Sequence, residues 1–473
     1  MSDVASLAAA TPATRDRYVD FLRVASLAGV ILGHFLMAVV DDRPAATGGH
    51  AFVFTNMFAL APWTRPATWV LQVMPIFFVV GGFAHATSLR SLARRGGGYA
   101  DFARARIARL VWPALVFVTA GMVAGVVVEA VLGTGTKYSP VLQIAGQLLW
   151  FIGIYLIAAG LAPAMLRLHE RFGWRTLAAL VLAVGLVDWL RLAQGVDGVK
   201  WLNFALVWVT LHQLGFFYAD GVADRVGARR LGLWLFAVAG GAAALLMWLG
   251  PYGTAMVSYD GEKLSNLAPP TVVLLAFGVA QAGVLLLLRA PARRLLDRPR
   301  VWRAVIAGGA VAMTAFLWHF SALILMYIGW HLLFSPMPEP LTATWWWTRV
   351  PQFAVFLALV AGLVAAFRRF DRPPRREVVV GRSAWRASLA GVGVACAILG
   401  MLGYAVVGFR GVVSGYTAHV AGVPMTAVAA FALVVASAAL TSLAARSPGS
   451  ARTRRAPLPD LPTPSEEARR SSP

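Results

Sequence analysis

The chain has 473 residues, of which 59% are hydrophobic and 13% are charged, and its mean hydropathy is +0.69. Soluble domains carry about a quarter charged residues, so this composition excludes a water-soluble fold. The net charge of +21 comes from basic residues between the apolar runs, not from one patch, which argues against nucleic-acid binding. The single cysteine, Cys396, excludes a disulfide framework.

Apolar runs of roughly 20 residues, each long enough to cross a bilayer, recur along the chain. They predict an all-α, polytopic membrane bundle of about twelve transmembrane helices, because a helix satisfies its own backbone in lipid. The expected spans are 19–40, 68–89, 108–132, 141–166, 176–193, 201–219, 231–250, 269–289, 304–334, 351–367, 387–409 and 424–445. Residues 1–18 should form a cytoplasmic segment without a cleavable signal, and the Arg-, Pro- and Ser-rich residues 446–473 a disordered cytoplasmic tail.

The basic residues between the spans predict the orientation of the chain. With the N-terminus inside, the inner segments hold 33 Lys and Arg and the outer loops hold eight. The positive-inside rule then places both termini in the cytoplasm. Only three of the 42 basic residues are lysine, a bias that hints at a GC-rich bacterial genome and therefore at a bacterial plasma membrane. In the outer loops, the apolar residues 50–63 suggest a re-entrant or interfacial segment, and 342–349 an aromatic belt.

Two polar residues stand inside the first span, "RVASLAGVILGH", from Arg23 to His34. Eleven residues of helix turn about 20° past three full turns, so both side chains share one face, about 16 Å apart along the axis. Asp20, three residues before Arg23, is placed to pair with it. Arg23 could be a topology marker and His34 a buried hydrogen-bonding residue, but ionisable groups inside a membrane generally have a function. A histidine can also accept a proton near neutral pH.

An Arg and a His separated by ten residues in the first helix resemble the signature of the acyltransferase-3 family of integral-membrane acyltransferases. Five further elements resemble that family's pattern, in its order, between about residues 17 and 323. They are "FFVVGGF" with Phe77, Phe78, Gly81, Gly82 and Phe83; the basic loop with Arg106, Arg109 and Pro113; "LWF" with Trp150; "LHQLG" with His212 and Gly215; and "LWH" with His319. Gly81 stands where many relatives have Ser, so no covalent serine intermediate is inferred there.

The resemblance implies a core of ten helices, here 19–367, followed by a membrane extension at 368–445 whose two helices have no counterpart in it. It also implies transfer of an acyl group, usually acetyl, from cytoplasmic acyl-coenzyme A to a hydroxyl, or less often an amine. The acceptor would be a glycan, a glycolipid or a small natural product. His34 and Arg23 would be the catalytic residues, and Arg106 and Arg109 would bind the donor, since guanidinium groups suit phosphates.

The supporting residues would be Asp20, Gly81, Gly82, Phe83, Trp150, His212 and His319. Besides the lipid bilayer, the acyl-coenzyme A donor and the acceptor, no metal, prosthetic group or nucleic acid is expected, and the sequence does not indicate an oligomeric state. His34 could act as a general base or become acylated itself.

The alternative function is a secondary transporter with twelve spans. A proton-coupled transporter would place carboxylates near mid-membrane, whereas the acids here lie mostly in loops or at span ends, as Glu129 does, or Asp188 beside Arg191.

The expected orientation can be tested by cysteine accessibility in intact cells, on a background in which Cys396 is replaced. Single cysteines at Gly97 and Ser465 should resist a membrane-impermeant reagent, and a cysteine at Ser258 should react, because only the last lies in an outer loop. Reaction at Gly97 from outside would refute the orientation, and permeabilised cells control for reactivity.

Overall fold

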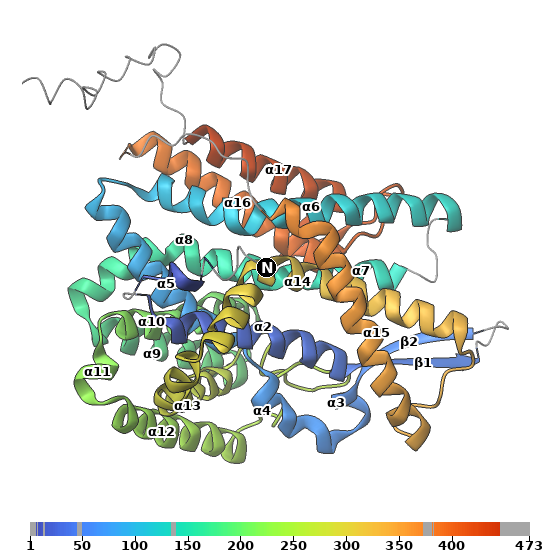
Figure 1. Ribbon diagram of the computed structural model, residues 1–473, viewed down its shortest axis with the longest axis horizontal. Coiled ribbons are helices and arrows are strands. Elements are labelled where there is room, and N and C mark those ends of the chain that lie inside the picture. The colour runs from blue at the N-terminus through green and yellow to red at the C-terminus, as the bar shows by residue number, and fades with distance from the viewer. Residues whose placement is uncertain are drawn as a thin grey trace, which may run out of the picture.

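The computed structural model describes residues 6, 8–12, 15–44, 50–133, 139–371, 381 and 383–444 (Figure 1). The predicted disordered tail, 446–473, lies outside the described residues. The elements of the first half are α2 (Arg17–Met37), β1 (Ala38–Pro44), β2 (His50–Asn56), α3 (Met57–Leu60), η1 (Pro62–Ala67), α4 (Thr68–Leu71), α5 (Met74–Arg94), α6 (Tyr99–Leu132), α7 (Ser139–Gln147), α8 (Leu149–Phe172), α9 (Trp174–Leu192), η2 (Asp197–Leu202), α10 (Asn203–Ala219) and α11 (Val222–Val226). Those of the second half are α12 (Ala228–Leu249), α13 (Val272–Leu296), α14 (Pro299–Leu333), α15 (Ala343–Phe367), η3 (Arg368–Phe370), α16 (Ala384–Val407), β3 (Ala418–Val420), β4 (Val423–Met425) and α17 (Ala427–Ala444).

The predicted all-α membrane bundle is confirmed. Within the described residues, eleven helices are long and apolar enough to cross a membrane. The fifth expected span, 176–193, is helical as α9 but is not among the eleven, since the 19 residues of α9 include Arg175, Asp188 and Arg191. Asp188 is buried, whereas the neighbouring Arg191 lies 3.9 Å from Asp197. Asp188 accepts hydrogen bonds from the side chains of Asn203 and Tyr252 at 3.0 and 3.2 Å and from the Val272 backbone N–H at 2.7 Å.

The bundle has two ends that are easily recognised in Figure 1, one carrying α11 and the other the antiparallel β1–β2 hairpin. We call them the α11 end and the hairpin end. The stretch expected to be re-entrant or interfacial forms β2, α3 and the start of η1, beyond the C-terminus of α2. The strand pairs with β1 from Ala38↔Asn56 to Pro44↔His50, so the backbone groups of β2 find hydrogen-bond partners in a neighbouring strand.

Helix α2 lies between α5, α13 and α14. At its N-terminus the side chain of Asp16 accepts hydrogen bonds from the backbone of Tyr18 and Val19, as an N-cap does. At its C-terminus the hydroxyl of Tyr327, from α14, donates to the carbonyl of Ala38 at 2.8 Å. Both ends of the helix that carries Arg23 and His34 are therefore fixed by side chains.

Helices α16 and α17 run side by side along one edge of the bundle and pack against α6 and α8 (Figure 1). Glu129 of α6 accepts backbone hydrogen bonds from Gly411, Val413 and Ser414, in the segment that follows α16. At the other end of α6, Arg386 pairs with Asp101 at 3.6 Å. The C-terminal pair of helices is thus attached to both ends of α6.

Helices α5 and α10 cross closely at two glycines, Gly82 and Gly215. A Cβ atom at Gly82 would overlap the carbonyl oxygen of His212 and lie 3.1 Å from the Cα of Gly215. Small residues allow such backbone contact between membrane helices, where van der Waals packing replaces the hydrophobic effect. The space beside Gly82 in the second span is therefore occupied by the backbone of α10.

Gly82→Ala should destabilise the protein by about 3 kcal/mol, the upper part of the range for overpacked sites, because its new methyl group meets backbone that cannot rotate away. Gly185→Ala is the matched control, since a Cβ there has no other atom within 4 Å. The thermal unfolding midpoint in detergent should fall for the first variant and hardly change for the second. An unchanged midpoint for Gly82→Ala would show that the crossing is not tight.

Candidate active site

His34 of α2 and His319 of α14 form a hydrogen-bonded pair inside the bundle. The His34 Nδ1 and His319 Nε2 atoms are 2.8 Å apart, and the two rings are stacked with centroids 5.0 Å apart. His319 is fully buried, whereas His34 is half-buried. The edge of the pair is closed by Phe320, whose ring lies 4.6 Å from that of His34. The two candidates from opposite parts of the sequence therefore meet at one site.

The hydrogen bonds of this pair determine which ring nitrogen of His34 is free. The Nδ1 atom of His319 lies 2.6 Å from the carbonyl oxygen of Phe316, which can only accept, so this nitrogen carries the proton. In the neutral ring, Nε2 of His319 is then an acceptor and receives the Nδ1–H of His34. The Nε2 atom of His34 is left with an available lone pair. Catalytic histidines commonly have a hydrogen-bond partner that fixes their tautomer in this way.

Arg23 lies on the same side of α2 as His34, facing α14. Its Nη2 atom is 3.7 Å from Asp20, as expected from their spacing, and would be 3.8 Å from a Cβ at Gly309. Asp20 also pairs with Arg15, at 2.5 Å. The side chain of Arg23 is 48% exposed and lies toward the α11 end, so it can meet a charged ligand there.

A second histidine pair lies between α5 and α10. The Nδ1 atom of His85 is 2.9 Å from Nε2 of His212, and both residues are buried. The hydroxyl of Tyr155, from α8, is 3.5 Å from Nε2 of His85. His212 was a candidate from the sequence, but His85 and Tyr155 were not. A histidine inside the apolar run 74–89 was a signal in the sequence, whereas its partner is visible only in the fold.

Arg106 and Arg109 both lie inside α6, near its start. Arg106 donates to the Ser88 hydroxyl at 3.0 Å and lies over the ring of Phe102, while Arg109 is exposed. The positive charges of Arg109 and Arg23 act on Arg106, so three guanidinium groups from two helices share this region. Such a cluster attracts anions.

The remaining candidates pack in the bundle. Gly81 faces Tyr155, and a Cβ there would lie 2.9 Å from the tyrosine hydroxyl. Phe83 packs edge-on against Tyr218, with ring centroids 5.5 Å apart. Trp150 packs among apolar side chains beside α10, and its neighbour Phe151 reaches the ring of Phe316. Among the residues that the structure covers, no three His, Cys, Asp or Glu side chains group as metal ligands would.

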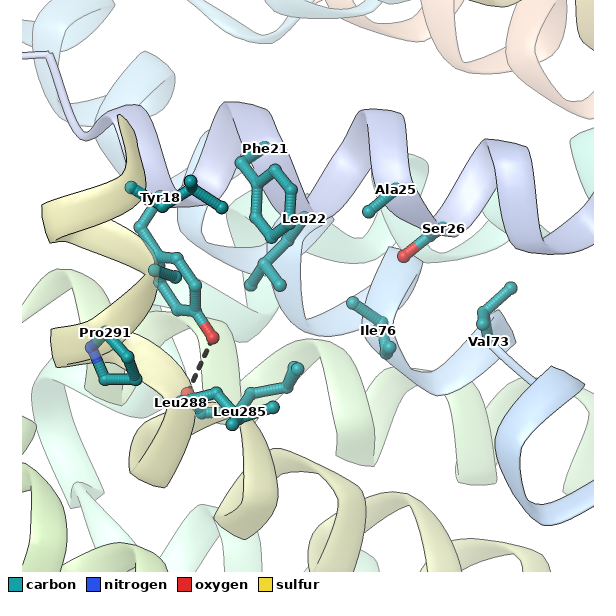
Figure 2. Close-up of a pocket in the computed structure, with 12 residues that line it drawn as sticks. Tyr18, Phe21, Leu22, Ala25, Ser26, Val73, Ile76, Leu285, Leu288 and Pro291 are labelled. Atoms are coloured by element: carbon teal, nitrogen blue, oxygen red, sulfur yellow. Dashed lines mark hydrogen bonds between the residues drawn. The ribbon is translucent and has the colours of Figure 1, made fainter. Parts of the chain in front are cut away.

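A cavity of about 420 Å³ lies between α2, α5 and α13 (Figure 2). Its walls are almost wholly apolar, and Figure 2 shows the Tyr18 hydroxyl at one end donating to the Leu285 carbonyl, 2.6 Å away. The buried hydroxyl of Ser26 also faces this cavity. Neither histidine pair and no arginine lines it, so it does not suit an anionic ligand.

The profile of the acyltransferase domain family matches residues 16–367, which include both histidine pairs and all three arginines. The chain belongs to the acyltransferase-3 family. It is a membrane acyltransferase, and the family match favours this activity over transport. No curated protein and no solved structure matches the chain. The match ends at the last residue of α15, so α16 and α17 of this acyltransferase lie outside it.

Arg349 lies in the expected outer loop between the spans 304–334 and 351–367 and was not a candidate from the sequence. It is only 6% exposed, on the first turns of α15, where it donates to the Phe35 carbonyl and, at 2.7 Å, to the Tyr327 hydroxyl. Its guanidinium lies 4.1 Å from the centre of the Phe35 ring. A cation at a helix C-terminus is stabilised by the helix dipole. Arg349 thereby fixes the last turn of α2, next to His34.

Arg349→Met should lower the acyl-transfer rate by about 10- to 100-fold, because small displacements of a reacting group are costly. Donor binding should persist, since Arg349 lies at the hairpin end. The control is Arg410→Met, which also removes a guanidinium from an aromatic ring, 4.0 Å away at Tyr416, without touching α2. The measurement is kcat with thermal stability alongside. A fully active Arg349→Met enzyme would separate this arginine from the placement of His34.

Proposed function

We propose that this acyltransferase moves an acyl group, usually acetyl, from cytoplasmic acyl-coenzyme A to an acceptor hydroxyl, with His34 as the central catalytic residue. The observation that carries the proposal is the chain of hydrogen bonds from the Phe316 carbonyl through His319 to His34. It leaves the Nε2 atom of a half-buried imidazole with a lone pair that can accept a proton or attack a carbonyl.

Two chemical routes use this nitrogen. In the first, Nε2 of His34 takes the proton of the acceptor hydroxyl while its oxygen attacks the thioester carbonyl; the new C–O bond forms, the C–S bond breaks, and the proton passes to the leaving thiolate. In the second, Nε2 itself attacks the thioester carbonyl, a C–N bond forms, and the C–S bond breaks to release the thiolate. The acceptor oxygen then attacks the acyl-imidazole, the new C–O bond forms, the C–N bond breaks, and the hydroxyl proton passes to the thiolate. Both routes need the tautomer of His34 that His319 selects.

Arg23, Arg106 and Arg109 form the proposed donor entrance. Coenzyme A carries several phosphates, and a cluster of guanidinium groups binds phosphate oxygens in pairs. Arg23 and His34 are about 16 Å apart along α2, so a donor held at the arginines has to extend along the helix to bring its thioester to His34. Asp20 holds Arg23 near this entrance.

The membrane placement follows from the distribution of basic residues. We propose that the protein lies in a bacterial plasma membrane with both termini in the cytoplasm, so that the α11 end faces the cytoplasm. His34 then lies in the outer half of the bilayer. The acceptor is proposed to be a glycan, a glycolipid or a small natural product of the cell envelope, with a hydroxyl preferred to an amine.

His34→Ala should lower the rate of acyl transfer by about 10²–10⁴-fold if His34 is a general base. The rate should fall further if His34 is acylated. The assay is transfer of labelled acetyl from acetyl-coenzyme A by the purified full-length chain, with thermal stability and donor binding measured alongside. A labelled adduct at His34 after incubation with donor alone distinguishes the second route.

The exposed His419 of β3 provides the control, since His419→Ala removes an imidazole outside the bundle and should retain full activity. His319→Ala should lose less activity than His34→Ala, because it removes only the orienting partner. An active, folded His34→Ala enzyme would contradict the proposed mechanism.

A further inference from the structure

The second polar cluster of the bundle takes no part in the proposed acyl-transfer step at His34. It is formed by side chains of four helices, α5, α6, α8 and α10. They are His85, Ser88, Arg106, Tyr155 and His212, beside the ring of Phe102. His85 is fully buried and His212 is 1% exposed, so bulk water does not satisfy these groups.

Two donors of this cluster lack full partners. The Nε atom of Arg106 is buried and has no hydrogen-bond partner in the described part of the chain. The nearest partner of the Tyr155 hydroxyl is His85, at 3.5 Å, which is the limit of a hydrogen bond. Buried polar atoms in folded proteins are almost always paired, and an apolar bundle makes an unpaired one costly. These two groups are therefore available to pair with the polar atoms of a ligand.

Gly81 keeps the Tyr155 hydroxyl in this place. A Cβ at residue 81 would lie 2.9 Å both from the hydroxyl oxygen and from Cε2 of the ring. Any side chain there would push the phenol away from His85. The position of the Tyr155 phenol therefore depends on the absence of a side chain at Gly81.

The chemistry of the pair behind Tyr155 indicates the kind of group that it binds. If His85 donates to His212, its Nε2 accepts the Tyr155 proton, and the phenol oxygen can accept from a ligand N–H. If His212 donates to His85, the order reverses and the phenol donates to a ligand C=O. A phosphate offers only acceptors, whereas an amide offers both groups. The cluster therefore fits an amide better than a phosphate.

The position of the cluster points to one ligand. The ring of Phe102 packs edge-on against His85, with centroids 5.4 Å apart, and lies 5.1 Å from the guanidinium of Arg106, so the cluster adjoins the arginines of the donor entrance. We propose that Tyr155, supported by His85 and His212, binds the amide-bearing pantetheine arm of acyl-coenzyme A. This proposal rests on the proposed donor. The arm lies between the phosphates and the thioester, as the cluster lies next to the arginines.

The test compares two ligands on the purified full-length protein by calorimetry: coenzyme A, and adenosine 3′,5′-diphosphate, which has phosphates but no pantetheine arm. Tyr155→Phe should weaken coenzyme A binding by about 3- to 10-fold, the size of one hydrogen bond, and leave the diphosphate affinity unchanged. Arg109→Ala should weaken both. Tyr404→Phe is the matched control, because its buried hydroxyl has no partner within the described residues, and it should change neither affinity.

Failure of the inference is distinguishable from failure of the proposed function. If the wild type binds neither ligand, the proposed donor is wrong. If the wild type binds both and Tyr155→Phe is unchanged, or loses affinity equally for both, the arm is not held at Tyr155. Gly81→Ala gives a second variant should Tyr155→Phe not fold. It displaces the phenol without removing it and should weaken only coenzyme A binding.

Discussion

An imidazole inside an apolar helix bundle has to find its hydrogen-bond partner within the protein, because the surrounding lipid offers none. Here two such imidazoles find partners in other imidazoles, His34 with His319 and His85 with His212. Each pair joins helices that are far apart in the sequence. In a neutral pair of this kind one ring donates its single N–H to the other, so the partner at one end determines which nitrogen is free at the other. For His34, that end is the backbone carbonyl of Phe316.

The helices have to be held closely for these pairs to form. At the α5–α10 crossing, Gly82 and Gly215 let the backbones touch, and this brings His85 and His212 together three residues along each helix. At α2 the arrangement differs, because side chains fix both ends of the helix: Asp16 at the start, and Tyr327 and Arg349 at the finish. Close backbone packing positions the His85–His212 pair, whereas side chains at both ends of α2 position the His34–His319 pair.

The C-terminal helices α16 and α17 lie outside the family match but are attached to α6, the helix that carries Arg106 and Arg109. Arg386 pairs with Asp101, less than two turns before Arg106 along α6. At the far end, Glu129 accepts three backbone hydrogen bonds from the segment after α16. A carboxylate with several N–H partners is held firmly, since each such bond to a charged group is strong. The extension thereby braces the helix from which the proposed donor entrance is built.

The sequence by itself determined the fold class and the family resemblance. Apolar runs long enough to cross a bilayer form helices there, because a helix satisfies its own backbone hydrogen bonds in lipid. Helix periodicity alone places Arg23 and His34 on one face of the first helix. Only the tertiary structure decided the partners. Nothing local to His34 selects His319, which is 285 residues away, and nothing in the run around His85 indicates Tyr155 or His212. Likewise, Gly81 and Gly82 in the sequence showed a space, and the neighbouring helices decided what fills it. Local periodicity sets which way a side chain points along its own helix, whereas its contacts depend on how separate helices pack.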